Sequence, residues 1–405
     1  MQQLALLDSK PAFAAPLHVG RPNIGDRELF MAYANQIFDT RWLSNQGPLV
    51  RKFKQTLCDY LGVKHCIPVC NATIGLEIAI RALGMQGEVI VPSFTFVATA
   101  HALQWQGITP VFADIDPVTH NLDPYAVEKL ITPRTTGIIG VHLWGRPSDV
   151  VGLERLASKY NLKLMYDAAH AFGCSYQGQM IGNFGAAEVF SFHATKFFNT
   201  FEGGAIVTND PDLAARIQLM TNFGFSGYDE VDSIGTNGKM TEVSAAMGLT
   251  NFHSIDDFIR ANRRNYQQYQ REFADIPGIT LLSHDLEERR NFQYIIVEVD
   301  AQQSGISRNA LVQVLHAENV LARRYFWPGC HRVEPYRTLY PGAGRHLPCT
   351  EQVAEQVMAL PTGTAVGEYE IAIIGDIVRT AVANAHSLRK EAHHAFWAET
   401  TLQLA

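Results

Sequence analysis

The amino-acid sequence predicts an α/β fold whose large domain contains a mostly parallel sheet. The main evidence is a regular alternation of apolar segments and helical patterns between residues 88 and 166. The apolar segments are short and uninterrupted, which is typical of parallel strands buried on both faces, and the helical segments between them can serve as crossovers. With 405 residues, the chain is long enough for this domain and a smaller one.

Two helices are expected before the alternation begins. Apolar residues at helical spacing lie between residues 21 and 40, and a second helix is expected over residues 49–61, with Gly62 as its C-cap. The loop between them contains Ser-Asn and Gly-Pro pairs. We expect residues 1–40 to form an N-terminal arm, residues 41–255 the large domain, and residues 256–405 a smaller C-terminal α+β domain.

A strand–turn–helix junction follows. A short strand is expected over residues 66–69, and a helix begins at Asn71, Ala72 and Thr73 and ends near residue 83. The unpaired N–H groups and the dipole of a helix N-terminus favour an anion, and the Thr73 hydroxyl can bond a phosphate oxygen. An ordinary N-cap formed by Asn71 would give the same pattern.

The alternation itself predicts strands over residues 88–92, 110–114, 137–142 and 162–166, and helices over residues 93–104, 124–130 and 149–160. The last strand leads into Asp167, with His170 one helical turn further along. Ligands of such sheets bind at the carboxyl ends of the strands. A buried carboxylate needs a partner, and the protonated nitrogen of a pyridine ring is one; a helix-capping aspartate is the alternative.

A lysine lies in a turn between two apolar strands. The strands are expected over residues 189–192 and 205–208, and the turn carries Lys196 and a Gly-Gly pair. An ammonium group in this setting costs free energy unless it is paired or its pKa falls. A lysine of lowered pKa can attack a carbonyl group, whereas a lysine that extends into solvent has no such role.

The second half of the chain changes character near residue 279. Helices are expected over residues 211–221, 243–249 and 255–274 before this point. A strand over residues 294–299, a helix over 307–318, an aromatic loop at 325–328 and a final helix over 367–386 are expected after it. These elements suggest the smaller α+β domain.

Composition excludes several classes of function. The chain is 47% hydrophobic and 18% charged with a formal charge of -7, which argues against nucleic acid or an anionic membrane as its partner. No apolar run spans a bilayer, and the N-terminus lacks the pattern of a signal peptide. The six cysteines and the histidines show no metal-ligand spacing, and no strand is followed by G-x-G-x-x-G. We therefore expect a cytoplasmic protein with reduced thiols and no metal ion.

Four separated features, in this order, resemble one known family, the pyridoxal 5'-phosphate (PLP)-dependent nucleotide-sugar aminotransferases of fold type I. The resemblance extends from about residue 41 to residue 349. It implies a fold type I large domain, a small C-terminal domain and a homodimer with active sites at the subunit interface. The features are Asn71-Ala72-Thr73, Phe96, Asp167-Ala-Ala-His170 and Ser191-Phe-His193-Ala-Thr-Lys196.

The resemblance also implies roles for single residues. Lys196 forms a Schiff base with PLP and then shuttles a proton, Asp167 pairs with the pyridine nitrogen, and His170 lies near the phenolic oxygen. Phe96 stacks on the ring, and His193 lies in the same segment as the lysine. The residues expected at the phosphate are Asn71, Ala72, Thr73, Ser191 and, from the partner subunit, Asn237.

Substrate contacts are implied in the same way. Aromatic side chains and the basic residue Arg323 suit a nucleobase and a diphosphate. Many family members have arginine where this chain has Lys239, so a bidentate contact is not expected there. The substrate-binding residues that the resemblance implies are Trp42, Ser44, Asn45, Lys239, Arg323, Tyr325 and Trp327.

The reaction implied is a ping-pong transamination with glutamate as donor, in which the cofactor alternates between PLP and pyridoxamine 5'-phosphate. Several motifs are most similar to those of enzymes acting at C4 of dTDP-4-keto-6-deoxyglucose, often in antibiotic sugar pathways. Amination at C3 of a dTDP-3-keto-6-deoxyhexose is the alternative, because the cofactor contacts would be the same. A 3-dehydratase, or a non-catalytic binding or regulatory protein, is disfavoured because Lys196 and Asp167 are both present.

Overall fold

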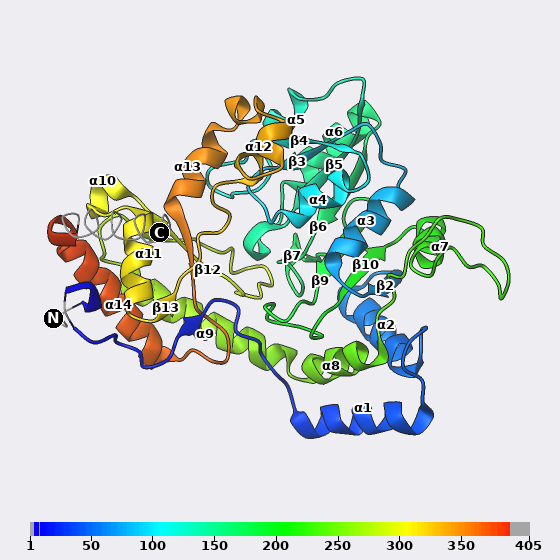
Figure 1. The fold of residues 1–405 in the computed structure, drawn as a ribbon, viewed down its shortest axis with the longest axis horizontal. Coiled ribbons are helices and arrows are strands. Elements are labelled where there is room, and N and C mark those ends of the chain that lie inside the picture. Colours follow the sequence, from blue (N-terminus) through cyan, green and yellow to red (C-terminus); the bar gives the residue numbers. More distant parts are fainter. Residues whose placement is uncertain (1–3, 8, 389–405) are drawn as a thin grey trace, which may run out of the picture.

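A computed structural model describes residues 4–7 and 9–388 of the protein. A seven-stranded sheet lies at the centre of the larger part of the molecule (Figure 1). Strand β10 is antiparallel to both of its neighbours, and the remaining strands are parallel to one another, as predicted. In spatial order the strands are β2 (His65–Val69), β10 (Gly204–Thr208), β9 (Ala187–Ser191), β6 (Lys163–Asp167), β5 (Thr135–Val141), β3 (Glu88–Pro92) and β4 (Thr109–Ala113).

Helices cover both faces of this sheet. Successive residues of a strand point to opposite faces, so Val189 packs into the core on one side and Phe190 into the core on the other. The first core lies under α3 (Ala72–Ala82), α4 (Ala98–Gln104) and α7 (Pro211–Met220). The other face is covered by α2 (Pro48–Leu61), α5 (Pro124–Glu128), α6 (Val150–Tyr160) and α8 (Glu242–His253).

One predicted helix begins later than expected. The sequence predicts a helix from residue 93, but α4 begins at Ala98, and residues 93–96 form a loop. The carbonyl oxygen of Ser93 accepts a hydrogen bond from the N–H of Cys330 at 2.9 Å, and the Ser93 hydroxyl lies 2.7 Å from Nδ1 of His331. These contacts with Cys330 and His331 hold Ser93 in a loop conformation. In a helix the carbonyl and hydroxyl groups of Ser93 would point in other directions.

A second, three-stranded antiparallel sheet forms the centre of the smaller part, in the order β11 (Ile279–Leu281), β12 (Ile295–Val299) and β14 (Val357–Leu360). Its core is completed by helices that the sequence predicts, whereas β11, β14 and the helix α13 (Pro348–Gln356) were not predicted. The predicted helices are α9 (Ile255–Phe273), α11 (Arg308–Ala317) and α14 (Glu368–Ala383).

The N-terminal segment crosses between the two parts. Strand β1 (Leu17–His18) pairs in parallel with β13 (Val320–Leu321), and Leu4 is buried in the core of the smaller part. The carboxylate of Glu318, 2% exposed, accepts hydrogen bonds from the backbone N–H groups of Ala5 and Ala12 at 2.6 and 2.7 Å.

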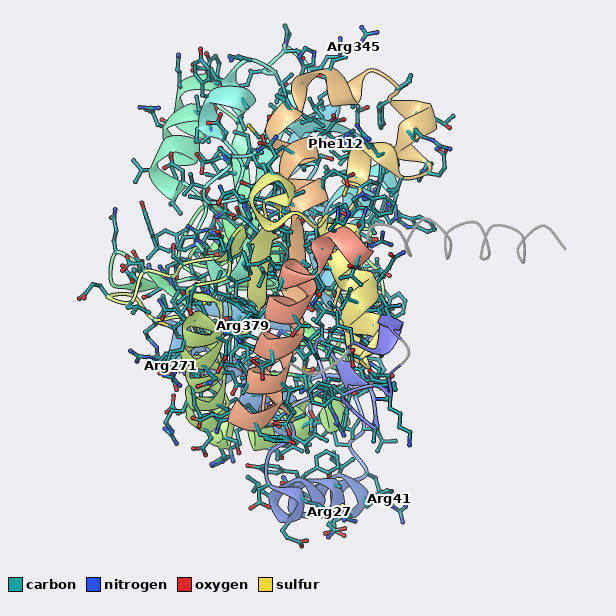
Figure 2. The ribbon with its side chains drawn as sticks, turned by 90° about the vertical axis from the view of Figure 1, so that its left-hand side faces the viewer. Arg27, Arg41, Phe112, Arg271, Arg345 and Arg379 are labelled. Atoms are coloured by element: carbon teal, nitrogen blue, oxygen red, sulfur yellow. The ribbon has the colours of Figure 1, made fainter. Side chains whose placement is uncertain are left out.

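Helix α1 (Arg27–Thr40) lies beside α8 at one end of the molecule, as Figures 1 and 2 show. Residues from 330 to 347 join the core of the large sheet through Cys330, Tyr336 and Leu347. The division into an arm and two domains stays a prediction. Among the described residues, no helix combines the length and apolar character that a membrane span requires.

Candidate active site

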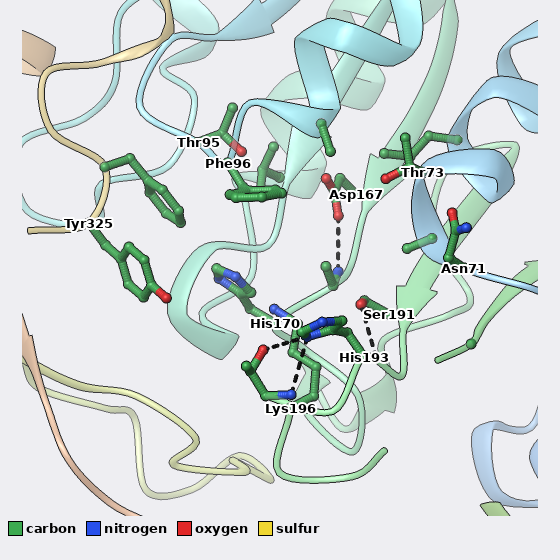
Figure 3. Close-up of a pocket in the computed structure, with 18 of the residues that line it drawn as sticks. Asn71, Thr73, Thr95, Phe96, Asp167, His170, Ser191, His193, Lys196 and Tyr325 are labelled. Carbon is green, nitrogen blue, oxygen red and sulfur yellow. Dashed lines mark hydrogen bonds between the residues drawn. The ribbon is translucent and has the colours of Figure 1, made fainter. Parts of the chain in front are cut away.

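A cavity of about 600 Å³ opens at the carboxyl ends of the parallel strands. Val141, Asp167 and Ser191, the last residues of β5, β6 and β9, all line it. Figure 3 shows Asp167, Ser191 and Lys196 facing the same space. The residues predicted from the sequence that line this cavity are Asn71, Ala72, Thr73, Phe96, Asp167, His170, Ser191, His193, Lys196, Arg323 and Tyr325.

Lys196 lies in the turn between β9 and β10 and extends into the cavity. Its Nζ atom donates a hydrogen bond to the hydroxyl oxygen of Tyr294 at 3.0 Å. Burial lowers the pKa of Lys196 from its ordinary value of 10.5 to about 8, although the negative charge of Asp167 acts in the opposite direction. With this pKa, about a tenth of the amine is uncharged and nucleophilic at pH 7.

Asp167 is buried at the opposite side of the cavity. Burial raises the pKa of this carboxyl group, while hydrogen bonds from the N–H of Ala169 at 3.0 Å and from the hydroxyl of Thr99 at 2.8 Å oppose the rise, as does the charge of Lys196. A cationic ring nitrogen in the cavity would stabilise the ionised form further.

The residues after Asp167 form turns and not the helical turn that was expected. The carbonyl oxygens of His170 and Phe172 accept hydrogen bonds from Nδ2 of Asn291, at 2.8 and 3.0 Å. Asn291, which is distant in the sequence, therefore holds this backbone in a non-helical conformation.

The cavity ends at the N-terminus of α3. The side chain of Asn71 accepts a hydrogen bond from the N–H of Ile74 at 2.9 Å, so it is the helix cap. Ala72, Thr73 and Ser191 line the cavity at the same end. The capping role and a phosphate-binding role are therefore compatible, because the cap leaves the first N–H groups of the helix and the Thr73 hydroxyl beside the cavity.

Aromatic rings form the remaining wall. Phe96 is 57% exposed and lies at the cavity surface. Nδ1 of His170 accepts a hydrogen bond from the N–H of Trp144 at 3.3 Å, and burial lowers the pKa of the His170 ring, so the imidazole is neutral and carries its proton on Nε2. The ring of Phe326 stacks on Trp144 at 5.2 Å with an angle of 7° between the rings.

Three contributors to this site were missed by the sequence predictions, namely Thr99, Trp144 and Tyr294, whereas Phe326 belongs to the predicted aromatic loop at residues 325–328. Thr99 lies in α4, one turn after Thr95, and Tyr294 lies one residue before β12. No motif in their neighbourhood marks them. A topological signal existed for Trp144, which lies shortly after β5, at the carboxyl end of a strand where ligands were expected; Tyr294 precedes a strand of the small sheet, where none was expected.

Several predicted residues lie outside the cavity of their own chain. Trp42, Ser44 and Asn45 lie in the loop between α1 and α2. Asn237 forms a β-bridge with Asn222, whose side chain accepts a hydrogen bond from Nζ of Lys239 at 2.8 Å. Nε1 of Trp327 donates to Glu355 at 2.8 Å. Within one chain these residues do not contribute to the site.

A half-buried lysine of lowered pKa and a buried carboxylate, on a sheet of this topology, are the features expected of a PLP-dependent enzyme of fold type I. Comparison of the sequence with family models agrees. The DegT/DnrJ/EryC1/StrS aminotransferase family matches residues 25–379, and the chain belongs to this family. It is an aminotransferase whose cofactor is PLP.

Individual relatives cover nearly the whole chain. It is 39% identical over 368 residues to the dTDP-4-amino-4,6-dideoxy-D-glucose transaminase of Shigella dysenteriae, covering 89% of this chain and 99% of that protein. The corresponding Escherichia coli transaminase is 35% identical over 353 residues, with coverages of 86% and 94%. The crystal structure of DesI in the presence of its TDP-sugar product superposes with a TM-score of 0.91 at 48% identity, covering 97% of this chain and 99% of that one.

The residues of this chain fit the cofactor. The cavity offers a carboxylate for a cationic ring nitrogen, an amine for an aldehyde, and a helix N-terminus with the Thr73 and Ser191 hydroxyls for a phosphate. Charge and donor type therefore agree at each of the three chemically distinct ends of PLP.

Proposed function

We propose that this aminotransferase installs an amino group at C4 of dTDP-4-keto-6-deoxyglucose, taking it from glutamate. The observation that carries the proposal is the similarity to dTDP-4-amino-4,6-dideoxy-D-glucose transaminases over most of both chains. The name of that product places the new amine at the carbon that bears the keto group in the substrate. We further propose that the product serves the synthesis of a deoxyaminosugar for a natural product such as an antibiotic.

Bound PLP would supply an electron-accepting ring. The ring would take up the electron pair that remains when a C–H bond is broken at the carbon next to the amino nitrogen. The chain supplies the groups that make this transfer possible. Asp167, buried and held by the Ala169 N–H and the Thr99 hydroxyl, keeps the ring nitrogen protonated. Lys196, with its pKa near 8, takes the proton from one carbon and returns it to another.

Arg323 is proposed to bind the diphosphate of the sugar nucleotide. Its guanidinium group lines the cavity and lies 5.3 Å from the centre of the Tyr325 ring. Within residues 4–7 and 9–388 its side chain forms no ion pair, in contrast to Arg308 and Arg332, which lie near Glu355 and Glu351. A cation without a protein partner beside an aromatic ring suits a phosphate and a base.

We propose that the active protein is a homodimer in which each subunit completes the site of the other. Asn237 forms a β-bridge with Asn222, and Lys239 bonds the side chain of the same residue, so both lie in a loop that also carries exposed apolar side chains. A second copy would cover this surface. The exposed residues of this loop, with their exposed fractions, are Phe223 (48%), Phe225 (40%) and Ile234 (74%). The cytoplasmic location stays a prediction.

The test is a single-turnover reaction of the pyridoxamine form of the protein. It is mixed with dTDP-4-keto-6-deoxyglucose and, separately, with the 3-keto isomer, and the product is examined by NMR. Conversion of the 4-keto sugar alone supports the proposal. Conversion of the 3-keto sugar alone would move the proposed site of amination from C4 to C3 and leave the proposed catalytic roles unchanged. Conversion of neither sugar would show that the substrate is a different keto compound.

A further inference from the structure

The segment immediately before β12 reaches from the small sheet into the active-site cavity. Tyr294, which is 8% exposed, lines the cavity, and its hydroxyl oxygen accepts the hydrogen bond from Nζ of Lys196 at 3.0 Å. The centre of its ring lies 5.7 Å from the same nitrogen. Among the residues that the structure describes, Nζ of Lys196 forms no other hydrogen bond. The position of the free amine therefore depends on Tyr294.

Residues 291–294 also hold the backbone around the site. Oε1 of Gln293 accepts a hydrogen bond from the N–H of Phe197, the residue after the lysine, at 3.0 Å. Nδ2 of Asn291 donates to the carbonyl oxygen of His170 at 2.8 Å. One short segment thus contacts both turns that carry the predicted catalytic groups. The hydrogen bonds of Asn291 and Gln293 to these turns reach backbone atoms, whereas Tyr294 contacts the reactive nitrogen itself.

We propose that Tyr294 is a positioning residue for Lys196. The Tyr294 hydroxyl holds the lysine amine in one place whenever that amine is not bonded to carbon. The inference rests on the proposed role of Lys196 and adds a residue from the other sheet. A lysine side chain has several rotatable bonds, and a buried N–H group without an acceptor is costly, so a single acceptor selects one position. The amine then takes up and returns its proton at the same point in each turnover.

The hydrogen bond has a consequence that is separate from catalysis. A charged ammonium group gains more from an oxygen acceptor than a neutral amine does. Replacement of Tyr294 by phenylalanine removes the acceptor, so the pKa of Lys196 is expected to fall further below its wild-type value, by about one pH unit. In turnover, kcat is expected to fall about tenfold, because the amine is no longer held in place.

The experiment measures the reactivity of Lys196 in the full-length protein loaded with pyridoxamine 5'-phosphate. This form of the cofactor has no carbonyl group, so the lysine amine is free. The protein is pulsed with acetic anhydride at pH values between about 6 and 10, and mass spectrometry of the peptide that contains Lys196 gives the midpoint of labelling. Tyr269→Phe, which removes a buried tyrosine hydroxyl that donates to the carbonyl oxygen of Pro361 outside the cavity, is the matched control.

A lower midpoint in Tyr294→Phe, together with a wild-type midpoint in Tyr269→Phe, supports the proposal. Equal midpoints in Tyr294→Phe and the wild type overturn it. Tyr294→Leu, which also lacks an acceptor, gives the same decision if the phenylalanine variant does not fold. Because the labelling uses no sugar, an error in the proposed substrate leaves this result unchanged, and the two proposals fail separately.

Discussion

The hydroxyl of Thr99 donates a hydrogen bond to Oδ2 of Asp167 at 2.8 Å, joining the first turn of α4 to the last residue of β6. Both side chains are buried. The bond stabilises the ionised form of a carboxyl group whose pKa burial raises, so a residue without any charge helps to set the charge of the site.

Thr99→Val tests this relationship. Loss of the donor is expected to raise the pKa of Asp167 further and to lower kcat about tenfold, because less of the carboxylate is ionised. The acidic limb of the kcat profile should move to higher pH. Thr250→Val is the control, since Thr250 is equally buried but bonds the carbonyl of Ala246 in α8. An unmoved acidic limb in Thr99→Val would count against the role.

Asp167→Asn is expected to keep the cofactor but to lose about a hundredfold or more in kcat, because an amide cannot hold a proton on the ring nitrogen by charge. Cofactor content after gel filtration and kcat are the two measurements. Asp114→Asn serves as the control, because Asp114 is a buried carboxylate that bonds the N–H groups of Cys349 and Thr350, away from the cavity. A near wild-type rate in Asp167→Asn would refute the assignment.

Lys196 should also leave a signature in the stability of the cofactor-free protein. Its pKa is about 8 in the folded chain and near 10.5 when unfolded, so between these pH values the unfolded state binds more protons. The free energy of unfolding therefore rises with pH in this window, by an amount on the order of 1–3 kcal/mol. Lys196→Met removes the effect. Urea unfolding of both proteins at about pH 7.5 and 9.5 measures it, and parallel pH dependences would contradict the lowered pKa.

Mixed dimers test the shared site. If Asn237 serves the partner's cavity, Lys196→Ala and Asn237→Ala subunits form heterodimers with one complete site, and random mixing restores about a quarter of wild-type activity. A mixture of Lys196→Ala and Asp167→Asn subunits is the control, because both defects lie in the chain's own cavity and no complete site forms. Equal activities of the two mixtures, after verified exchange, would exclude the sharing.

Glu318→Ala tests the attachment of the N-terminal segment. The buried carboxylate accepts two backbone hydrogen bonds, so its loss is expected to lower the free energy of unfolding by about 1–3 kcal/mol and to speed proteolysis before residue 20. Glu318→Gln keeps one acceptor oxygen and should be intermediate. Chemical unfolding and limited proteolysis are the measurements, and kcat should not change.

Local sequence patterns were sufficient for the parallel sheet, for most helices, and for the ends of the strands where ligands bind. Asp167 and Lys196 could be placed because each follows a buried strand. Their partners could not, because Thr99 and Tyr294 are 68 and 98 residues away along the chain. The short strands β11 and β14 were missed for a similar reason: three or four residues carry too little periodicity, and pairing with β12 creates them.

The pairing of β1 with β13 joins Leu17 to Val320, two residues that are far apart along the chain. During translation β1 therefore has no partner until Glu318 and β13 have also been synthesised. Contacts of such long range slow folding. Leu4 and Leu17, whose core partners include Val320, therefore stay exposed until that residue is synthesised, and a chaperone that binds nascent chains has a long opportunity to bind this apolar segment.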